Sequence, residues 1–178
     1  GELPFQPSLA VTGAGAATTW INVVYARYSF PISSAIMSLS SSNGGVTFVG
    51  PVIIQSNNVP LRLLMGPESS YLGNVLHVVW YDPILIPAFG LYLLQAARSV
   101  NNGGTFVAAP IAILPEWGGP LLPVVTLTWI LPTLYPHIAS DFATNMVYVI
   151  SGVSFPLGIF PDNPFLLVFI YDTDGNLL

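Results

Sequence analysis

Short apolar runs alternate with clusters of Gly, Pro, Asn and Ser along the whole chain. Many of these runs are rich in Val, Ile, Tyr, Phe and Thr, which is typical of β-strands separated by turns. The 17 Pro and 16 Gly are spread throughout and leave few windows long enough for a helix. The best helical window, residues 89–98, contains Gly90 next to aromatic residues. The pattern therefore predicts an all-β protein.

The strand pattern is repeated along the chain. A hydrophobic strand is predicted at residues 20–26, 75–81 and 146–150, and a further strand follows it at 35–38, 91–94 and 165–171. A segment led by proline precedes the first and third of these pairs, and its counterpart in the second, near Pro67, is weak. Four strands in roughly 55 residues, repeated, form the unit of a β-propeller blade. The predicted blades are 1–58, 59–116 and 117–178, the last one incomplete.

Three such blades do not close a ring, because propellers typically have about four to eight. We therefore expect a region of β-propeller whose ring has six or more blades, completed by missing blades or by self-association. A β-sandwich is the alternative architecture for the same strands.

One eight-residue segment occurs twice, as residues 41–48 and 99–106. The shared positions are Ser41, Asn43, Gly45, Thr47 and Phe48 in the first copy and Ser99, Asn101, Gly103, Thr105 and Phe106 in the second. Asn43-Gly44 and Asn102-Gly103 predict hairpin turns whose two central residues have φ > 0. The Ser and Asn side chains are expected to bond nearby backbone N–H groups, and the two Phe rings to pack inward. The repeated segment thus indicates a structural hairpin.

These two hairpins resemble the Asp-box, the Ser-x-Asp-x-Gly-x-Thr-Trp motif of BNR-repeat sialidases and of many other β-propellers. Asn43 and Asn101 stand in place of the Asp, and the two Phe residues in place of the Trp. A third box is expected to begin at Asp172-Thr-Asp174. The resemblance implies propeller blades, and in sialidases it comes with an arginine triad, a Tyr–Glu nucleophile pair and an Asp acid/base.

The chain has three arginines, but their contexts do not reproduce that triad. Arg98 directly precedes a box, which places it at the outer edge of a blade, and Arg62 lacks the Arg-Ile-Pro context of the family's first arginine. Arg27, at a strand end, is the one expected near the axial face. Trp117, in a Pro- and Gly-rich stretch between blades, is the candidate for an exposed sugar-binding aromatic residue. Arg27 and Trp117 are therefore the predicted binding residues, and the catalytic residues stay unassigned.

Charge and composition narrow the classes of function. Charged residues make up 6% of the chain, there is no Lys, and the net charge is -5, which argues against binding nucleic acid. With no Cys and two distant histidines the sequence predicts no metal site and no cofactor. His77 alternates with Val75 and Val79 and is expected to be structural. The oxygen-rich segment beginning at Asp172 could start a calcium loop, but a plain turn is favoured.

The mean hydropathy of +0.70 raises the question of a membrane span. The longest uncharged apolar segment, residues 118–140, is interrupted by Pro120, Pro123, Pro132 and Pro136, so we expect no transmembrane helix. Polarity carried by Ser, Thr, Asn and Gln suits an extracellular or cell-surface protein. The first hypothesis for function is a non-catalytic binding or scaffolding propeller, with carbohydrate as its partner. A sialidase-type glycoside hydrolase and a structural subunit of an extracellular filament are the alternatives.

Overall fold

A computed structural model describes residues 2–12, 18–29, 33–59, 63–83, 91–109, 128–129, 136–153 and 165–172 of the 178-residue chain. Every regular element in these ranges is a β-strand, and all strand pairs are antiparallel. No helix in this part of the chain is long and apolar enough to cross a membrane. The expectation of an all-β protein is confirmed.

The strands form three sheets that follow one another along the chain. The first sheet has the order β1-β2-β3-β4, with β1 Glu2–Val11, β2 Ile21–Ser29, β3 Ser33–Ser41 and β4 Val49–Asn57. The second has the order β5-β6-β7-β8, with β5 Met65–Leu72, β6 Val75–Pro83, β7 Leu91–Ser99 and β8 Val107–Ala109, and β9 Thr128–Trp129 pairs with β7. The third has the order β10-β11-β12, with β10 His137–Asp141, β11 Met146–Val153 and β12 Phe165–Tyr171. Apart from β9, each sheet is a meander in which consecutive strands are neighbours.

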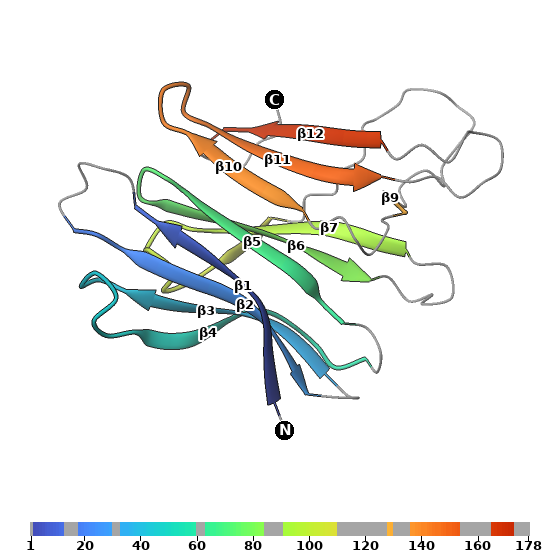
Figure 1. Ribbon diagram of the computed structural model, residues 1–178, viewed down its shortest axis with the longest axis horizontal. Coiled ribbons are helices and arrows are strands. Elements are labelled where there is room, and N and C mark those ends of the chain that lie inside the picture. Colours follow the sequence, from blue (N-terminus) through green and yellow to red (C-terminus); the bar gives the residue numbers. More distant parts are fainter. Residues whose placement is uncertain are drawn as a thin grey trace.

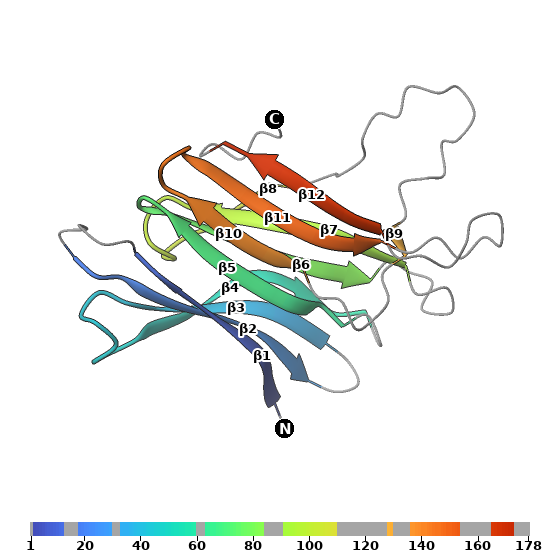
Figure 2. The ribbon, with the colours of Figure 1, turned by 45° about the horizontal axis from the view of Figure 1, so that its top comes forward.

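The second sheet lies between the other two (Figures 1 and 2). A first core fills the space between the first and second sheets, and its members include Val24, Ile36, Leu76 and Trp80. A second core lies between the second and third sheets and is built from the opposite face of β6. Because successive residues of a strand point to opposite faces, alternate residues of β6 belong to the two cores, as Trp80 and Tyr81 do. The second sheet is therefore covered on both faces.

The two copies of the repeated hairpin have the same internal hydrogen bonds. In the first, Ser41 Oγ donates to Asn43 Oδ1 at 2.8 Å and accepts from the Gly45 N–H at 2.9 Å. Asn43 Oδ1 also accepts from the Thr47 N–H at 2.9 Å, and Asn43 Nδ2 donates to Thr47 Oγ1 at 2.8 Å. The second copy repeats all four bonds at 2.8–3.0 Å, from its own Ser, Asn, Gly and Thr. Side chains of Ser and Asn thus hold both turns, as the sequence indicated.

Two details of the hairpin prediction are wrong. The residues with positive φ in the first turn are Gly44 and Gly45, not Asn43 and Gly44, because the turn starts one residue later than the Asn-Gly pair suggests. Phe48 does not pack inward, since 44% of its surface is exposed, whereas Phe106 packs against the first core. The window at residues 89–98 is also not helical but belongs largely to β7.

The strand register also shows which residue of the third sheet corresponds to the first serine of each repeated segment. Ile21 pairs with Ser41, Leu76 with Ser99 and Val147 with Tyr171, each second strand facing the last residue of its third strand. Tyr171, rather than Asp172, therefore occupies the position that Ser41 and Ser99 occupy in the first two sheets. The remainder of the expected box, from residue 173 onward, lies outside the described residues.

Candidate functional site

The first strands of the three sheets lie side by side along one edge of the stack. In Figure 1 β1, β5 and β10 follow one another across the front of the molecule, and β5 contacts both of the others. In a β-propeller this edge is the one that faces the central channel. The polar side chains on these three strands are therefore candidates for a functional site.

A polar seam joins β1 to β5. Gln6 Oε1 accepts from the Gly66 N–H at 2.8 Å, and Ser8 Oγ accepts from the Ser69 N–H at 3.0 Å. Ser8 Oγ also donates to Glu68 Oε2 at 3.1 Å. Both strands are irregular here, because their pairing to β2 and β6 shifts between Phe5 and Ser8 and between Met65 and Glu68. Such shifts re-aim side chains, and in this molecule they coincide with the side-chain bonds that link the two sheets.

The seam continues from β5 to β10. Ser70 Oγ and Ser140 Oγ lie 2.9 Å apart and share a hydrogen bond. Asp141 ends β10, and its carboxylate accepts from the Ala143 N–H and from Thr144 Oγ1, each at 2.8 Å. These bonds hold the pKa of Asp141 below its usual value, so it is ionised at neutral pH.

Glu68 is the carboxylate in the middle of this seam. Its side chain is half-buried, and the hydroxyl of Ser8 fixes one of its oxygens. An ionised carboxylate accepts hydrogen bonds from hydroxyl groups and can exchange a proton with them. Glu68 is therefore suited to bind a hydroxyl-rich ligand or to act as an acid or base.

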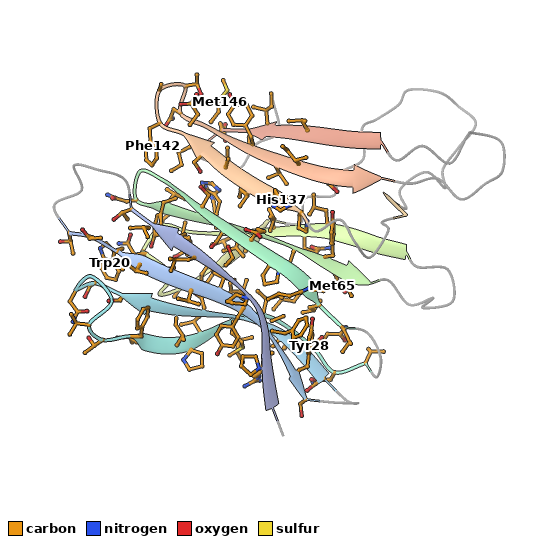
Figure 3. All side chains as sticks on the ribbon, in the orientation of Figure 1. Trp20, Tyr28, Met65, His137, Phe142 and Met146 are labelled. Carbon is orange, nitrogen blue, oxygen red and sulfur yellow. The ribbon has the colours of Figure 1, made fainter. Side chains whose placement is uncertain are left out.

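An exposed aromatic ring lies on the neighbouring inner strand, β1. Phe5 is 54% exposed, and its ring contacts that of Tyr28 with centroids 5.9 Å apart at an angle of 43°. The Tyr28 hydroxyl donates to the Leu64 carbonyl at 2.9 Å, so the supporting ring is held in place. Figure 3 shows Tyr28 and Met65 close together at this end of the sheets. An aromatic ring presented from a rigid strand offers an apolar face to a ligand.

Of the two residues predicted to bind, the structure describes Arg27, which is not part of this seam. Arg27 is half-buried on β2, paired with Pro4 and Ala35, and it alternates with the buried Ala26 that faces the second sheet. It therefore shares the face of the first sheet that points away from the second. Trp117 lies outside the described residues. Phe5 and Glu68 were missed because neither belongs to the repeated motif, and the irregular strand pairing beside each of them is not visible in the sequence.

The second hairpin packs against the first sheet. Asn22, fully buried on β2, donates from Nδ2 to the Asn102 carbonyl at 3.4 Å and to Ser38 Oγ at 3.3 Å, and its Oδ1 accepts from the Tyr71 hydroxyl. Gly103 lies so close to this amide that a Cβ atom there would overlap Asn22 Nδ2. The hairpin therefore links two sheets, which supports a structural role.

Within the described ranges, no group of three or more His, Asp or Glu side chains could hold a metal ion. His77 is buried on β6, as expected of a structural histidine. Desolvation, with a smaller contribution from the Arg98 guanidinium, lowers the pKa of His77 to about 4, although the Asp172 carboxylate opposes this. The imidazole is therefore neutral at physiological pH.

Comparison with known sequences identifies no relative. No protein-family profile matches this sequence, and no curated protein matches it. The fold, however, is shared with solved glycoside hydrolases.

Zg3597, a family 117 glycoside hydrolase from the marine bacterium Zobellia galactanivorans, superposes over 99% of this chain with a TM-score of 0.61 and 10% identity. A GH43_1 enzyme from Xanthomonas citri in complex with xylotriose covers 98% with a TM-score of 0.55 and 12% identity. A thermostable family-43 glycoside hydrolase covers 96% with a TM-score of 0.53 and 12% identity.

The chain spans about half the length of these structures, namely 54%, 52% and 56% of them. At such low identity the likeness establishes the fold alone. The sheets described above are antiparallel blades of a β-propeller, as the sequence predicted.

Proposed function

We propose that this chain is part of an extracellular or cell-surface β-propeller that binds carbohydrate at the seam between its first strands. The observation that carries the proposal is the placement of the Glu68 carboxylate and the exposed Phe5 ring on neighbouring inner strands. Structural neighbours that are glycoside hydrolases support a carbohydrate ligand.

The chemistry of the seam suits a sugar. The apolar C–H face of a pyranose or furanose ring can pack on Phe5, while the hydroxyl groups can donate to Glu68. A neutral ligand fits best, because the chain has three cations and a net charge of -5. Arg27 and Trp117 remain predicted binding residues, and neither contributes to the argument from the seam.

Binding is tested by calorimetric titration with soluble xylo-, arabino- and fructo-oligosaccharides and with a sialylated oligosaccharide. We expect one of these ligands to bind and Phe5→Ala to weaken that binding by roughly tenfold or more, as loss of an aromatic contact should. The matched control is Phe142→Ala, because Phe142 is also 54% exposed but lies in the β10–β11 turn. Equal affinity of the Phe5→Ala and wild-type proteins would remove the seam as the site.

A glycoside hydrolase is the second candidate function, favoured by the structural neighbours and by the half-buried Glu68 carboxylate. Glycoside hydrolysis generally uses a pair of carboxylates, so Glu68 would need a second carboxylate as its partner. Glu68→Gln should then abolish hydrolysis of the bound oligosaccharide while binding persists. The sialidase form of this hypothesis is tested with a fluorogenic sialoside and with Arg27→Ala. Fibres in electron micrographs would instead favour the structural filament subunit.

We also propose that the two hairpins are Asp-boxes in the sialidase sense, with Asn in place of Asp. The two hairpins share four hydrogen bonds, and each of these bonds involves the side chain of the Asn or of the Ser. This shared pattern supports the assignment. Restoring the family residue with Asn43→Asp keeps the acceptor oxygen but loses the donation to Thr47. The variant should therefore retain the hairpin, checked as native-like amide exchange of the Thr47 N–H.

Further blades are proposed to pack on the two open faces of the stack. On the first sheet, Leu9 and Ile53 point away from the second sheet and are 63% and 54% exposed. On the third, Val168 is 57% exposed beside Ile150. Such contiguous apolar faces mark interaction surfaces, and sheets of the same kind already cover the corresponding faces of the second sheet.

For this chain alone, a second copy is the available source of such sheets. Light scattering should therefore show a species heavier than the 19.0 kDa chain. Ile53→Lys should disperse that species, and Val107→Lys, at an exposed position of β8, serves as the control. A stable monomer of 19.0 kDa would refute association through these faces.

A further inference from the structure

The two interfaces between sheets can be compared position by position, because their registers match. Ile21 pairs with Val11 and Ser41, and Leu76 pairs with Tyr71 and Ser99. The next residue on each second strand, Asn22 on β2 and His77 on β6, faces the following sheet. His77 therefore occupies in the second interface the position that Asn22 occupies in the first.

In the first interface, both the nitrogen and the oxygen of the Asn22 side-chain amide have hydrogen-bond partners. The Asn22 amide bonds the Tyr71 hydroxyl, Ser38 Oγ and the Asn102 carbonyl. Tyr71 comes from β5 and Ser38 from β3, so each neighbouring strand contributes a partner. Burial raises the pKa of Tyr71, which remains a neutral hydroxyl and can donate.

In the second interface smaller side chains take the places of those partners. Val147 pairs with Ser140, so Ser140 stands where the first interface has Tyr71. Val79 pairs with Ala96 as Val24 pairs with Ser38, so Ala96 stands in place of that serine. The Ser140 hydroxyl instead bonds Ser70. Replacing Tyr by Ser and Ser by Ala removes both volume and two hydrogen-bonding groups beside His77.

A cavity of about 20 Å³ lies at this place. Its lining includes the polar residues His77, Arg98 and Tyr171, together with apolar side chains such as those of Val79, Ile138 and Val149. In Figure 3 side chains from the second and third sheets meet in this region, between β6 and β11. The volume suffices for one water molecule, which needs about 10–15 Å³ measured in this way.

Two buried polar atoms at the cavity have no hydrogen-bond partner among the described residues. They are Nε2 of His77, a residue 7% exposed, and the hydroxyl of Tyr171, a residue 4% exposed. A buried donor or acceptor that is left without a hydrogen bond destabilises the folded state. Buried water typically serves such groups.

We propose that this cavity is a binding site for a single water molecule, which hydrogen-bonds both His77 Nε2 and the Tyr171 hydroxyl. The water takes over the role that the Tyr71 hydroxyl and Ser38 play in the first interface. His77 and Tyr171 are both neutral, most of the lining apart from Arg98 is apolar, and the volume of about 20 Å³ admits one small molecule, so a single water fits.

The first test is a high-resolution crystal structure of the unmodified chain. We expect one ordered water within hydrogen-bonding distance of both atoms. An empty cavity, or a direct bond between His77 and Tyr171, would overturn the proposal.

The second test counts long-lived internal waters in solution by water-proton relaxation dispersion. Tyr171→Phe removes one of the two partners, and Ser140→Tyr together with Ala96→Ser restores the groups of the first interface. Each variant should hold one long-lived water fewer than the wild type. The control is Tyr81→Phe in the same core, because the Tyr81 hydroxyl already bonds Ser151 at 2.9 Å. An unchanged count in both test variants would refute the site, and if neither folds the crystal structure decides.

Discussion

Replacing Gly103 by alanine should destabilise this protein far more than the same change at the equivalent Gly45. Both glycines have φ of +89° and both N–H groups donate to the box serine. A residue with a Cβ atom in the left-handed region costs about 1–2 kcal/mol, so this contribution is common to the two variants. The environments of the two glycines differ, and that difference sets the prediction.

At Gly103 an added Cβ would overlap Asn22 Nδ2 and lie 3.2 Å from Asn22 Cγ. Asn22 has no exposed surface and is held by Tyr71 and Ser38, so it cannot move aside without losing bonds. Unsatisfied buried groups cost about 1–3 kcal/mol. At Gly45 the nearest atom is Ile21 Cδ1 at 3.5 Å, an ordinary contact. We therefore expect a loss of about 2–5 kcal/mol for Gly103→Ala against about 1–2 kcal/mol for Gly45→Ala.

The measurement is urea unfolding followed by the fluorescence of the buried Trp80, with the free energy of unfolding taken from the midpoint and slope. A cycle with Asn22→Ala isolates the contact, since removing the amide should relieve part of the penalty at Gly103 and none at Gly45. If both glycine variants lose the same stability within about 0.5 kcal/mol, the hairpin does not link the sheets in the way described.

Three further predictions concern single groups. Ser41→Ala and Ser99→Ala each remove two bonds of a box, so each should lower the free energy of unfolding by roughly 1–3 kcal/mol, measured by urea unfolding. A larger loss at the exposed first box than at the second would contradict the reasoning. The pKa of His77 in the folded protein is about 4, below the usual 6.5, because the folded state favours the neutral imidazole. The contribution of this neutral imidazole to the free energy of unfolding is therefore complete above pH 6.5 and is lost as the pH falls through 4. The loss should approach 3 kcal/mol and be absent in His77→Asn; an identical pH profile for that variant would rule it out. Asp141 has a lowered pKa, so its contribution is present above its unfolded value and disappears in acid; Asp141→Asn should remove that acid dependence from the exchange rate of the Ala143 N–H.

The sequence by itself determined the features that depend on neighbours along the chain. Alternating β-branched and aromatic runs specified strands, and the hairpins formed as indicated because their Ser and Asn side chains bond groups within four residues. Positive φ at Asn102 and Gly103 followed from the same local chemistry. The propeller fold could be predicted because each repeated unit of the sequence corresponds to one sheet of consecutive strands, which is the unit of a blade.

Only the tertiary structure decided which residues lie together across sheets. Ser8 and Glu68 meet across 60 positions of sequence, and the pairing of β1 shifts directly after the exposed Phe5, which spacing does not reveal. Residues 91–99 became a strand because β6 and β8 pair with them, which overrides their weak helical pattern. The tertiary structure also decides how the two repeated hairpins differ in burial. Phe106 lies against the first core, whereas Phe48, at the same position of the repeated segment, belongs to the first sheet, whose outer face is open.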